Sequence, residues 1–154
     1  MASAPWILLD TNILLRILRQ SDPQHQLIEK ALMGLESQGA ELCFSLQNVA
    51  EFWNVCTRPI DRNGFGLSIA EANQQVEIIE RTMTLLPDTA RVYSIWRQLI
   101  TAHNVRGVQA HDARLAAIML AYGVTRILTM NQPDSIRYAG IEAIHPSQVL
   151  LSKR

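Results

Sequence analysis

Three carboxylates and one amide occupy positions in the sequence from which a folded chain could gather them for chemistry. Asp10 ends an apolar run and precedes a helical pattern, and Glu51 lies in a helical segment that is otherwise mostly apolar. Asp112 stands at the start of a strongly apolar helical segment, and Asn131 follows another short apolar run. Carboxylate and amide oxygens are the ligands that Mg²⁺ and Mn²⁺ prefer. The four residues together predict a site for such an ion.

Each of these residues also has an ordinary explanation. Asp10 is a good N-cap for the helix that follows it. A single Glu such as Glu51 is most often solvated or ion-paired, and the helix dipole favours a carboxylate such as Asp112 in a first turn. Residues 131–134, Asn-Gln-Pro-Asp, are typical of a turn. These explanations are compatible with a shared metal site.

The residue types also indicate the kind of reaction. Carboxylates that share a pocket repel one another, and a divalent cation removes that repulsion. Cys43 and Cys56 lie in apolar contexts without a paired Cys or His spacing, which predicts buried free thiols and argues against zinc. Phosphoryl transfer and phosphodiester hydrolysis are the reactions that need a cluster of oxygen ligands.

Apolar runs of strand length alternate along the chain with segments of helical periodicity. We predict strands at residues 6–9, 41–44, 126–129 and 142–145, with a short additional strand at 84–87. This alternation predicts an α/β fold with a mostly parallel sheet and helices on both faces. In such sheets the active crevice lies beyond the carboxyl ends of the strands, which singles out Asp10, Ser45 and residues 129–131.

Capping and breaking residues set the helix boundaries. The helical stretch from Asn12 to about Gly39 is broken at Asp22-Pro23, and Ser68 with Glu71 forms a capping-box pattern. Residues 58–66 read as a loop. The predicted helices cover residues 12–39 in two parts, 45–56, 68–82, 89–103 and 109–122, with a short one at the end of the chain.

Length and charge limit the possible classes of protein. The 154 residues predict a single domain, 1–154, and the formal net charge of zero excludes a strongly basic coat for nucleic acid. No apolar stretch approaches the roughly 20 residues of a membrane span, and the first ten residues lack the basic region of a secretion signal. We therefore expect a cytoplasmic protein without membrane contact.

The chain resembles the PIN-domain family, of the VapC-like toxin type, over nearly its whole length. Each of the matching segments is a modest motif, and their order, spacing and strand-end positions make the resemblance specific. The segments are LLDTNILLR (8–16), AEFWNVCTRP (50–59), HDARLAA (111–117), ILTMNQPD (127–134) and GIEAIHP (140–146).

The resemblance implies a three-layer α/β/α sandwich with a parallel sheet of four or five strands. It also implies a metal-dependent endoribonuclease that uses Mg²⁺ or Mn²⁺ to hydrolyse RNA phosphodiester bonds. Asp10, Glu51 and Asp112 match the family's first three acids and would hold the metal. Asn131 takes the fourth catalytic position, which is an acid in many members, so a second metal would be held less tightly.

The same resemblance implies supporting roles for further residues. Asn12 and Thr129 would position ligands or the attacking water. Asp134, which precedes Ser135 where many relatives have Phe, is either a peripheral helper or a turn residue. Candidate contacts to single-stranded or looped RNA, chosen only because they lie near the motifs, are Arg16, Arg58, Arg114 and Arg137. An ordinary surface or ion-paired role is the commoner one for such arginines.

The resemblance also suggests partners. Relatives are commonly toxins neutralised by a cognate antitoxin protein, and they usually form homodimers, the default symmetry for small proteins. The Leu- and Ile-rich helices of residues 12–39 would offer a groove to an antitoxin segment, or would be ordinary core.

Several other functions are alternatives to the nuclease function. A catalytically weak or silent PIN-like module that binds RNA or protein is the main alternative, although none of the three acids is missing. An RNA-processing nuclease without a toxin role would look the same in sequence. A phosphatase of the haloacid-dehalogenase type needs a second Asp at the position of Asn12, and a nucleotide-binding protein needs a Gly-rich phosphate loop that the sequence lacks.

Overall fold

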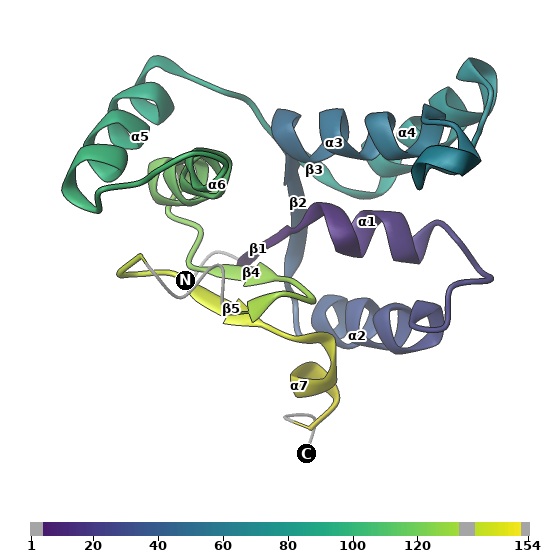
Figure 1. Ribbon diagram of the computed structural model, residues 1–154. Coiled ribbons are helices and arrows are strands. Elements are labelled where there is room, and N and C mark those ends of the chain that lie inside the picture. The colour runs from purple at the N-terminus through teal and green to yellow at the C-terminus, as the bar shows by residue number, and fades with distance from the viewer. Residues whose placement is uncertain (1–4, 133–137, 152–154) are drawn as a thin grey trace.

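A sheet of short strands forms the centre of the molecule. The computed structural model describes residues 5–132 and 138–151, and in this part the strands build one five-stranded parallel sheet (Figure 1). Its order is β3-β2-β1-β4-β5. The strands are β1 (Trp6–Leu9), β2 (Glu41–Ser45), β3 (Thr84–Leu86), β4 (Arg126–Leu128) and β5 (Glu142–Ile144). The predicted α/β fold with a parallel sheet is confirmed.

Helices connect the strands, and most of their limits lie within a residue or two of the predicted ones. A difference is the 3₁₀ helix η1 (Ile60–Arg62), which lies inside the segment predicted to be a loop. The α-helices are α1 (Thr11–Ile17), α2 (His25–Ser37), α3 (Leu46–Thr57), α4 (Ile69–Thr82), α5 (Ala90–Ala102), α6 (Gln109–Tyr122) and α7 (Pro146–Leu151).

The sheet is buried on both faces because successive residues of a strand point to opposite sides. Ile7 and Leu9 of β1 pack into one core cluster with residues of α1, α2, α3, α4 and α7. Leu8, between them, packs into a second cluster with residues of α5 and α6. Figure 1 shows α5 and α6 on one side of the sheet and α1 to α4 on the other. The result is the α/β/α layering that was expected.

Side-chain caps define where several helices begin. Ser45 and Asn48 form a capping box at the start of α3, and Ser68 and Glu71 form the predicted one at the start of α4. Ser45 is 2% exposed, so the structure assigns this strand-end residue to helix capping rather than to a crevice. Gly123 ends α6 with a φ of +71°, a left-handed conformation that glycine adopts without strain.

The two cysteines are free and buried, as predicted. Burial raises the pKa of the Cys43 thiol to about 12, with a further contribution from the charge of Glu41, and raises the pKa of Cys56 to about 11. Both side chains are therefore protonated core groups. None of the helices in the described residues is both long and apolar enough to cross a membrane.

The strand order creates a crevice at a defined place. From β1 the chain continues to β2 and β3 on one side, and it later adds β4 and β5 on the other side. Crevices in parallel sheets form beyond the carboxyl ends of the strands at such a switch point, which here lies between β1 and β4. Leu9 pairs with Leu128, so the residues that follow them, Asp10 and Thr129, lie next to each other.

Candidate active site

Asp10 is fixed at this switch point by both its backbone and its side chain. Its N–H donates to the carbonyl of Leu128 at 3.0 Å, which ties the end of β1 to β4. Its Oδ1 accepts from the N–H of Thr11 at 2.8 Å, and Asp10 is the N-cap of α1. Its Oδ2 accepts from the hydroxyl of Thr129 at 2.8 Å. Asp10 therefore caps α1, and this contact holds its carboxylate at the edge of the crevice.

Thr129 and Asn12 extend this arrangement across the two strand ends. Thr129 is fully buried, and its Oγ1 also accepts from the N–H of Asn131 at 3.0 Å. The Oδ1 of Asn12 accepts from the N–H of Met130 at 3.2 Å, and its Nδ2 lies 3.4 Å from both Asp10 Oδ2 and Thr129 Oγ1. Both residues therefore contact Asp10, which fits the supporting roles predicted for them.

Glu51 is oriented from the first turn of α1. The hydroxyl of Thr11 donates to Glu51 Oε2 at 3.2 Å and accepts from Asn48 Nδ2 at 3.3 Å. Asn48 is itself fully buried in the capping box of α3. A buried chain of polar contacts thus connects the start of α3 to the exposed carboxylate of Glu51. The sequence offers no pattern that predicts this link.

All four residues predicted to be catalytic line the same cavity. Asp10, Glu51, Asp112 and Asn131 surround a space of about 410 Å³ between α1, α3, α6 and the end of β4. Its remaining lining residues are Thr11, Asn12, Leu15, Asn54, Val55, Leu115, Ala116, Met119, Ile127, Tyr138 and Ile141. Acidic residues from three separate parts of the sequence therefore line one crevice, and most of its other lining residues are apolar.

The lining residues that were not predicted from the sequence include two with polar groups, Asn54 and Tyr138. Asn54 stands three residues after Glu51 on α3, so helical periodicity places both on one face, and that spacing could have indicated it. Tyr138 is 4% exposed and packs edge-on against His103 with 5.0 Å between ring centroids. It comes from the segment after β4, where no periodic pattern identifies a lining residue.

The donor set fits a hard divalent cation. The cavity wall offers carboxylate and amide oxygens, and neither Cys nor His is among its lining residues in the described part of the chain. Across residues 5–132 and 138–151 no group of three or more His, Cys, Asp or Glu is arranged so that it could hold a metal ion. Mg²⁺ keeps several of its waters and is typically held by one or two carboxylates, so a closed cage is not required.

The arginines predicted to contact RNA have local partners. Arg16 pairs with Asp22 at 3.2 Å, and Arg114 pairs with Asp88 at 3.3 Å. Arg58 donates from Nη2 to a carbonyl oxygen five residues later at 3.0 Å, within the loop that follows α3. None of the three lines the cavity. Arg137 and Asp134 lie outside the described residues.

Comparison with known families gives a match over most of the chain. The family described as PIN domain matches residues 7–133, which include Asp10, Glu51, Asp112 and Asn131. None of the curated protein sequences matches the chain.

Solved structures share the fold at low sequence identity. The VapBC2 complex of Rickettsia felis, bound to a DNA fragment from its promoter, has a TM-score of 0.68 and 13% identity, covering 91% of this chain and 98% of that chain. VapC20 of Mycobacterium tuberculosis, a toxin that cleaves the sarcin–ricin loop, has a TM-score of 0.63 and 18% identity, covering 84% and 92%. A toxin–antitoxin complex from Klebsiella pneumoniae has a TM-score of 0.63 and 17% identity, covering 91% and 97%. At these identities the similarity establishes the fold.

Proposed function

The chain belongs to the PIN-domain family, and we propose that it is a divalent-metal-dependent endoribonuclease that hydrolyses RNA phosphodiester bonds. PIN domains are typically nucleases. The observation that carries the proposal is the convergence of Asp10, Glu51, Asp112 and Asn131 on one cavity at the switch point of the sheet. A crevice lined by several carboxylates suits a cation and a phosphate, because the cation offsets the negative charge of both.

The proposal assigns the metal to the protein's own oxygen donors. Asp10, Glu51 and Asp112 would hold Mg²⁺ or Mn²⁺ directly or through water, with Asn131 as a neutral oxygen donor. When bound, the ion supplies a nucleophilic water at neutral pH and offsets the charge that builds up on the phosphate. Thr129 holds one oxygen of Asp10 in place by donating a hydrogen bond at 2.8 Å. That bond also keeps the carboxylate pointed at the cavity while its other oxygen caps α1.

The shape and charge of the molecule favour single-stranded or looped RNA. The site is a crevice beyond the carboxyl ends of β1 and β4, and an unpaired RNA strand can be splayed so that one phosphate enters it. The formal net charge is zero, so long-range attraction to RNA is weak and affinity depends on local contacts. Arg16, Arg58, Arg114 and Arg137 remain candidates for such contacts, and each of the three described ones would have to exchange its present partner for a phosphate.

We extend the proposal to a toxin role in the cytoplasm with a cognate antitoxin. The structural neighbours include toxin–antitoxin complexes with nearly full coverage of both chains, which supports a protein antitoxin as the partner. A symmetric homodimer, the commonest arrangement for small proteins, belongs to the same proposal.

The experiment that tests the nuclease is RNA cleavage by the purified chain with Mn²⁺ or Mg²⁺, with EDTA, and by Asp10→Asn. Asn caps helices as well as Asp, so this variant keeps the start of α1 while removing the charge. We expect cleavage that requires metal and is lost in the variant. Absence of both cleavage and metal binding in a folded chain would instead identify a catalytically silent RNA- or protein-binding module.

A further inference from the structure

The first turn of α6 carries Asp112 and contacts two neighbouring helices. Val108 occupies the N-cap position, and no side chain caps the helix there. The N–H groups of Ala110 and His111 donate to carbonyls of Gly107 and Val108, both at 3.0 Å, so these bonds remain within the same short stretch. A helix start without a side-chain cap frays more readily than a capped one. Hydrogen bonds from outside α6 add to what holds this turn.

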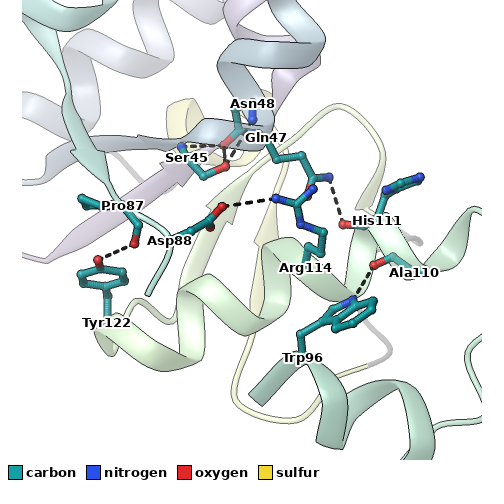
Figure 2. Close-up of polar contacts among 10 residues, drawn as sticks. All are labelled: Ser45, Gln47, Asn48, Pro87, Asp88, Trp96, Ala110, His111, Arg114 and Tyr122. Carbon is teal, nitrogen blue, oxygen red and sulfur yellow. Dashed lines mark hydrogen bonds and ion pairs between the residues drawn. The ribbon is translucent and has the colours of Figure 1, made fainter. Parts of the chain in front are cut away.

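Gln47 of α3 contacts this turn directly. Its Nε2 donates to the carbonyl of His111 at 2.9 Å, one residue before Asp112 (Figure 2). Gln47 is 8% exposed and lies one helical turn before Glu51, on the same face of α3. One side chain therefore joins the helix that carries Glu51 to the turn that carries Asp112.

Trp96 of α5 contacts the preceding carbonyl. Its Nε1 donates to Ala110 at 2.9 Å, so two successive carbonyls of the first turn accept bonds from two different helices. Figure 2 shows both side chains reaching this turn, while Arg114 and Tyr122 make their contacts elsewhere along α6. The two bonds fix the turn relative to both neighbouring helices.

The side-chain amide of Gln47 is buried and makes its hydrogen bond through the nitrogen alone. Its Oε1 is buried and finds no hydrogen-bond partner among the described residues, so the amide is only half satisfied. Leaving a buried polar atom unpaired costs free energy, and an apolar side chain of similar length would avoid that cost. A polar residue at this position is explained by the one bond it does make.

We propose that Gln47 and Trp96 are positioning residues that set the separation between Asp112 and Glu51, and through it the affinity of the cavity for a divalent cation. The inference rests on the proposed metal-dependent function. Hydrogen bonds behind metal-ligating side chains commonly tune affinity in this way, and their removal typically lowers metal affinity or activity about 10- to 100-fold.

The test uses Gln47→Met and Trp96→Phe, which keep most of the apolar volume and remove the donors. Tyr122→Phe is the matched control, because it removes a 2.6 Å bond from the far end of the same helix to the carbonyl of Pro87. Amide hydrogen exchange over residues 109–116 reports how firmly the turn is held, and calorimetric titration with Mn²⁺ reports affinity. Thermal unfolding confirms that each variant is folded.

We expect exchange in the turn to accelerate on the order of fivefold in Gln47→Met and Trp96→Phe. We expect their Mn²⁺ affinity to fall about 10- to 100-fold, while Tyr122→Phe stays near the wild type in both measurements. Unchanged exchange, or faster exchange with the Mn²⁺ affinity of the control, would overturn the inference. A wild-type chain that binds no Mn²⁺ would contradict the proposed function and the metal role of these residues, and exchange would still show separately whether they hold the turn.

Discussion

Thr129 is a neutral residue that orients the carboxylate of Asp10. It is fully buried at the end of β4, and its hydroxyl hydrogen is committed to Asp10 Oδ2 at 2.8 Å. Its oxygen meanwhile accepts from the N–H of Asn131 at 3.0 Å. The hydroxyl thereby connects the carboxylate of one strand end with the segment that carries the amide of the other.

Thr129→Val should keep the volume of this side chain and remove its hydrogen bonds to Asp10, Asn12 and Asn131. We expect metal affinity or cleavage to fall about 10- to 100-fold, because the Asp10 carboxylate loses the donor that orients it. Mn²⁺ titration and cleavage assays measure the effect. Thr82→Val is the control, since it removes a hydroxyl bond to the carbonyl of Ile78 on the distant α4. Equal effects of the two substitutions would show that Thr129 has no special relation to the site.

Asn131→Asp should strengthen the cation site. It places a further negative charge on the wall of the cavity that Asp10, Glu51 and Asp112 line, and a divalent cation is attracted by each added carboxylate. We expect tighter Mn²⁺ binding by calorimetry, with a second bound ion at high concentration. Gln98→Glu, on the exposed face of α5, adds the same charge away from the cavity and should leave binding unchanged. Mn²⁺ binding by Asn131→Asp that stays unchanged, as in the control, would place Asn131 outside the metal site.

The residues that share the cavity could be predicted only in part. Asp10, Asp112 and Asn131 stand at strand ends or a helix start and Glu51 lies in a mostly apolar helix, and the family resemblance then implied that the four act together. The contacts of Gln47 and Trp96 with α6 could not be predicted, because the residues they join are 64 and 14 positions apart in the chain. Such contacts depend on how helices pack, and the sequence contains no local signal for them.

At the scale of elements, α3 connects helix capping to the site. Ser45 accepts from the N–H of Asn48 and donates to Asn48 Oδ1 at 2.7 Å, and Asn48 then contacts Thr11, which orients Glu51. The cap at the start of the helix and the carboxylate in its second turn therefore belong to one connected set of hydrogen bonds.

Comparing Ser45→Ala with Ser68→Ala should distinguish a loss of stability from a loss of metal binding. Each removes the hydroxyl of a capping box, so we expect both to lower the free energy of unfolding by about 0.5–2 kcal/mol in urea titrations. Only Ser45→Ala should also weaken Mn²⁺ binding, because α4 contributes no residue to the cavity. An equal loss of metal affinity in both variants would show that general destabilisation, and not the chain of contacts to Glu51, is the cause.

Most element boundaries were predictable because they depend on local chemistry. The capping box of Ser68 and Glu71 and the left-handed Gly123 lie where their residue types favour them. The helix η1 was not predicted, because three residues, Ile60–Arg62, are too few to show a helical period. Its neighbourhood was recognised only as a loop.

At the scale of the whole molecule, the order of the strands creates the site. A parallel sheet of four or five strands was expected, and the order β3-β2-β1-β4-β5 comes from the structure alone. It follows from pairings such as Leu8 with Cys43 and Leu8 with Ile127, which join segments far apart in the sequence. With β1 in the centre, Asp10 meets residues from both halves of the chain.

The buried thiols give the whole molecule a pH dependence. The pKa is about 12 for Cys43 and about 11 for Cys56 in the folded chain, against a usual 9.0, because burial disfavours the thiolate. Below pH 9 both states keep these protons, so the contribution to stability is complete. As the pH rises from about 9 towards 11–12 the unfolded chain releases them first, and the free energy of unfolding falls.

Urea titrations at pH 7, 9 and 10.5 measure this fall. We expect a shallower dependence above pH 9 in Cys43→Ala, whatever its stability at pH 7, because one of the titrating thiols is gone. An identical slope in the wild type and the variant would show that other groups account for the alkaline dependence.

The central proposal is that Asp10, Glu51 and Asp112 together hold one divalent cation, directly or through water. The most direct measurement is calorimetric titration of Mn²⁺ into the wild-type chain beside Asp10→Asn, Glu51→Gln and Asp112→Asn, with folding verified for each. If the claim holds, the wild type binds Mn²⁺ and each substitution weakens that same binding event by at least about tenfold. Binding that persists unchanged in any two of the three variants, or no binding to the folded wild type, would contradict it.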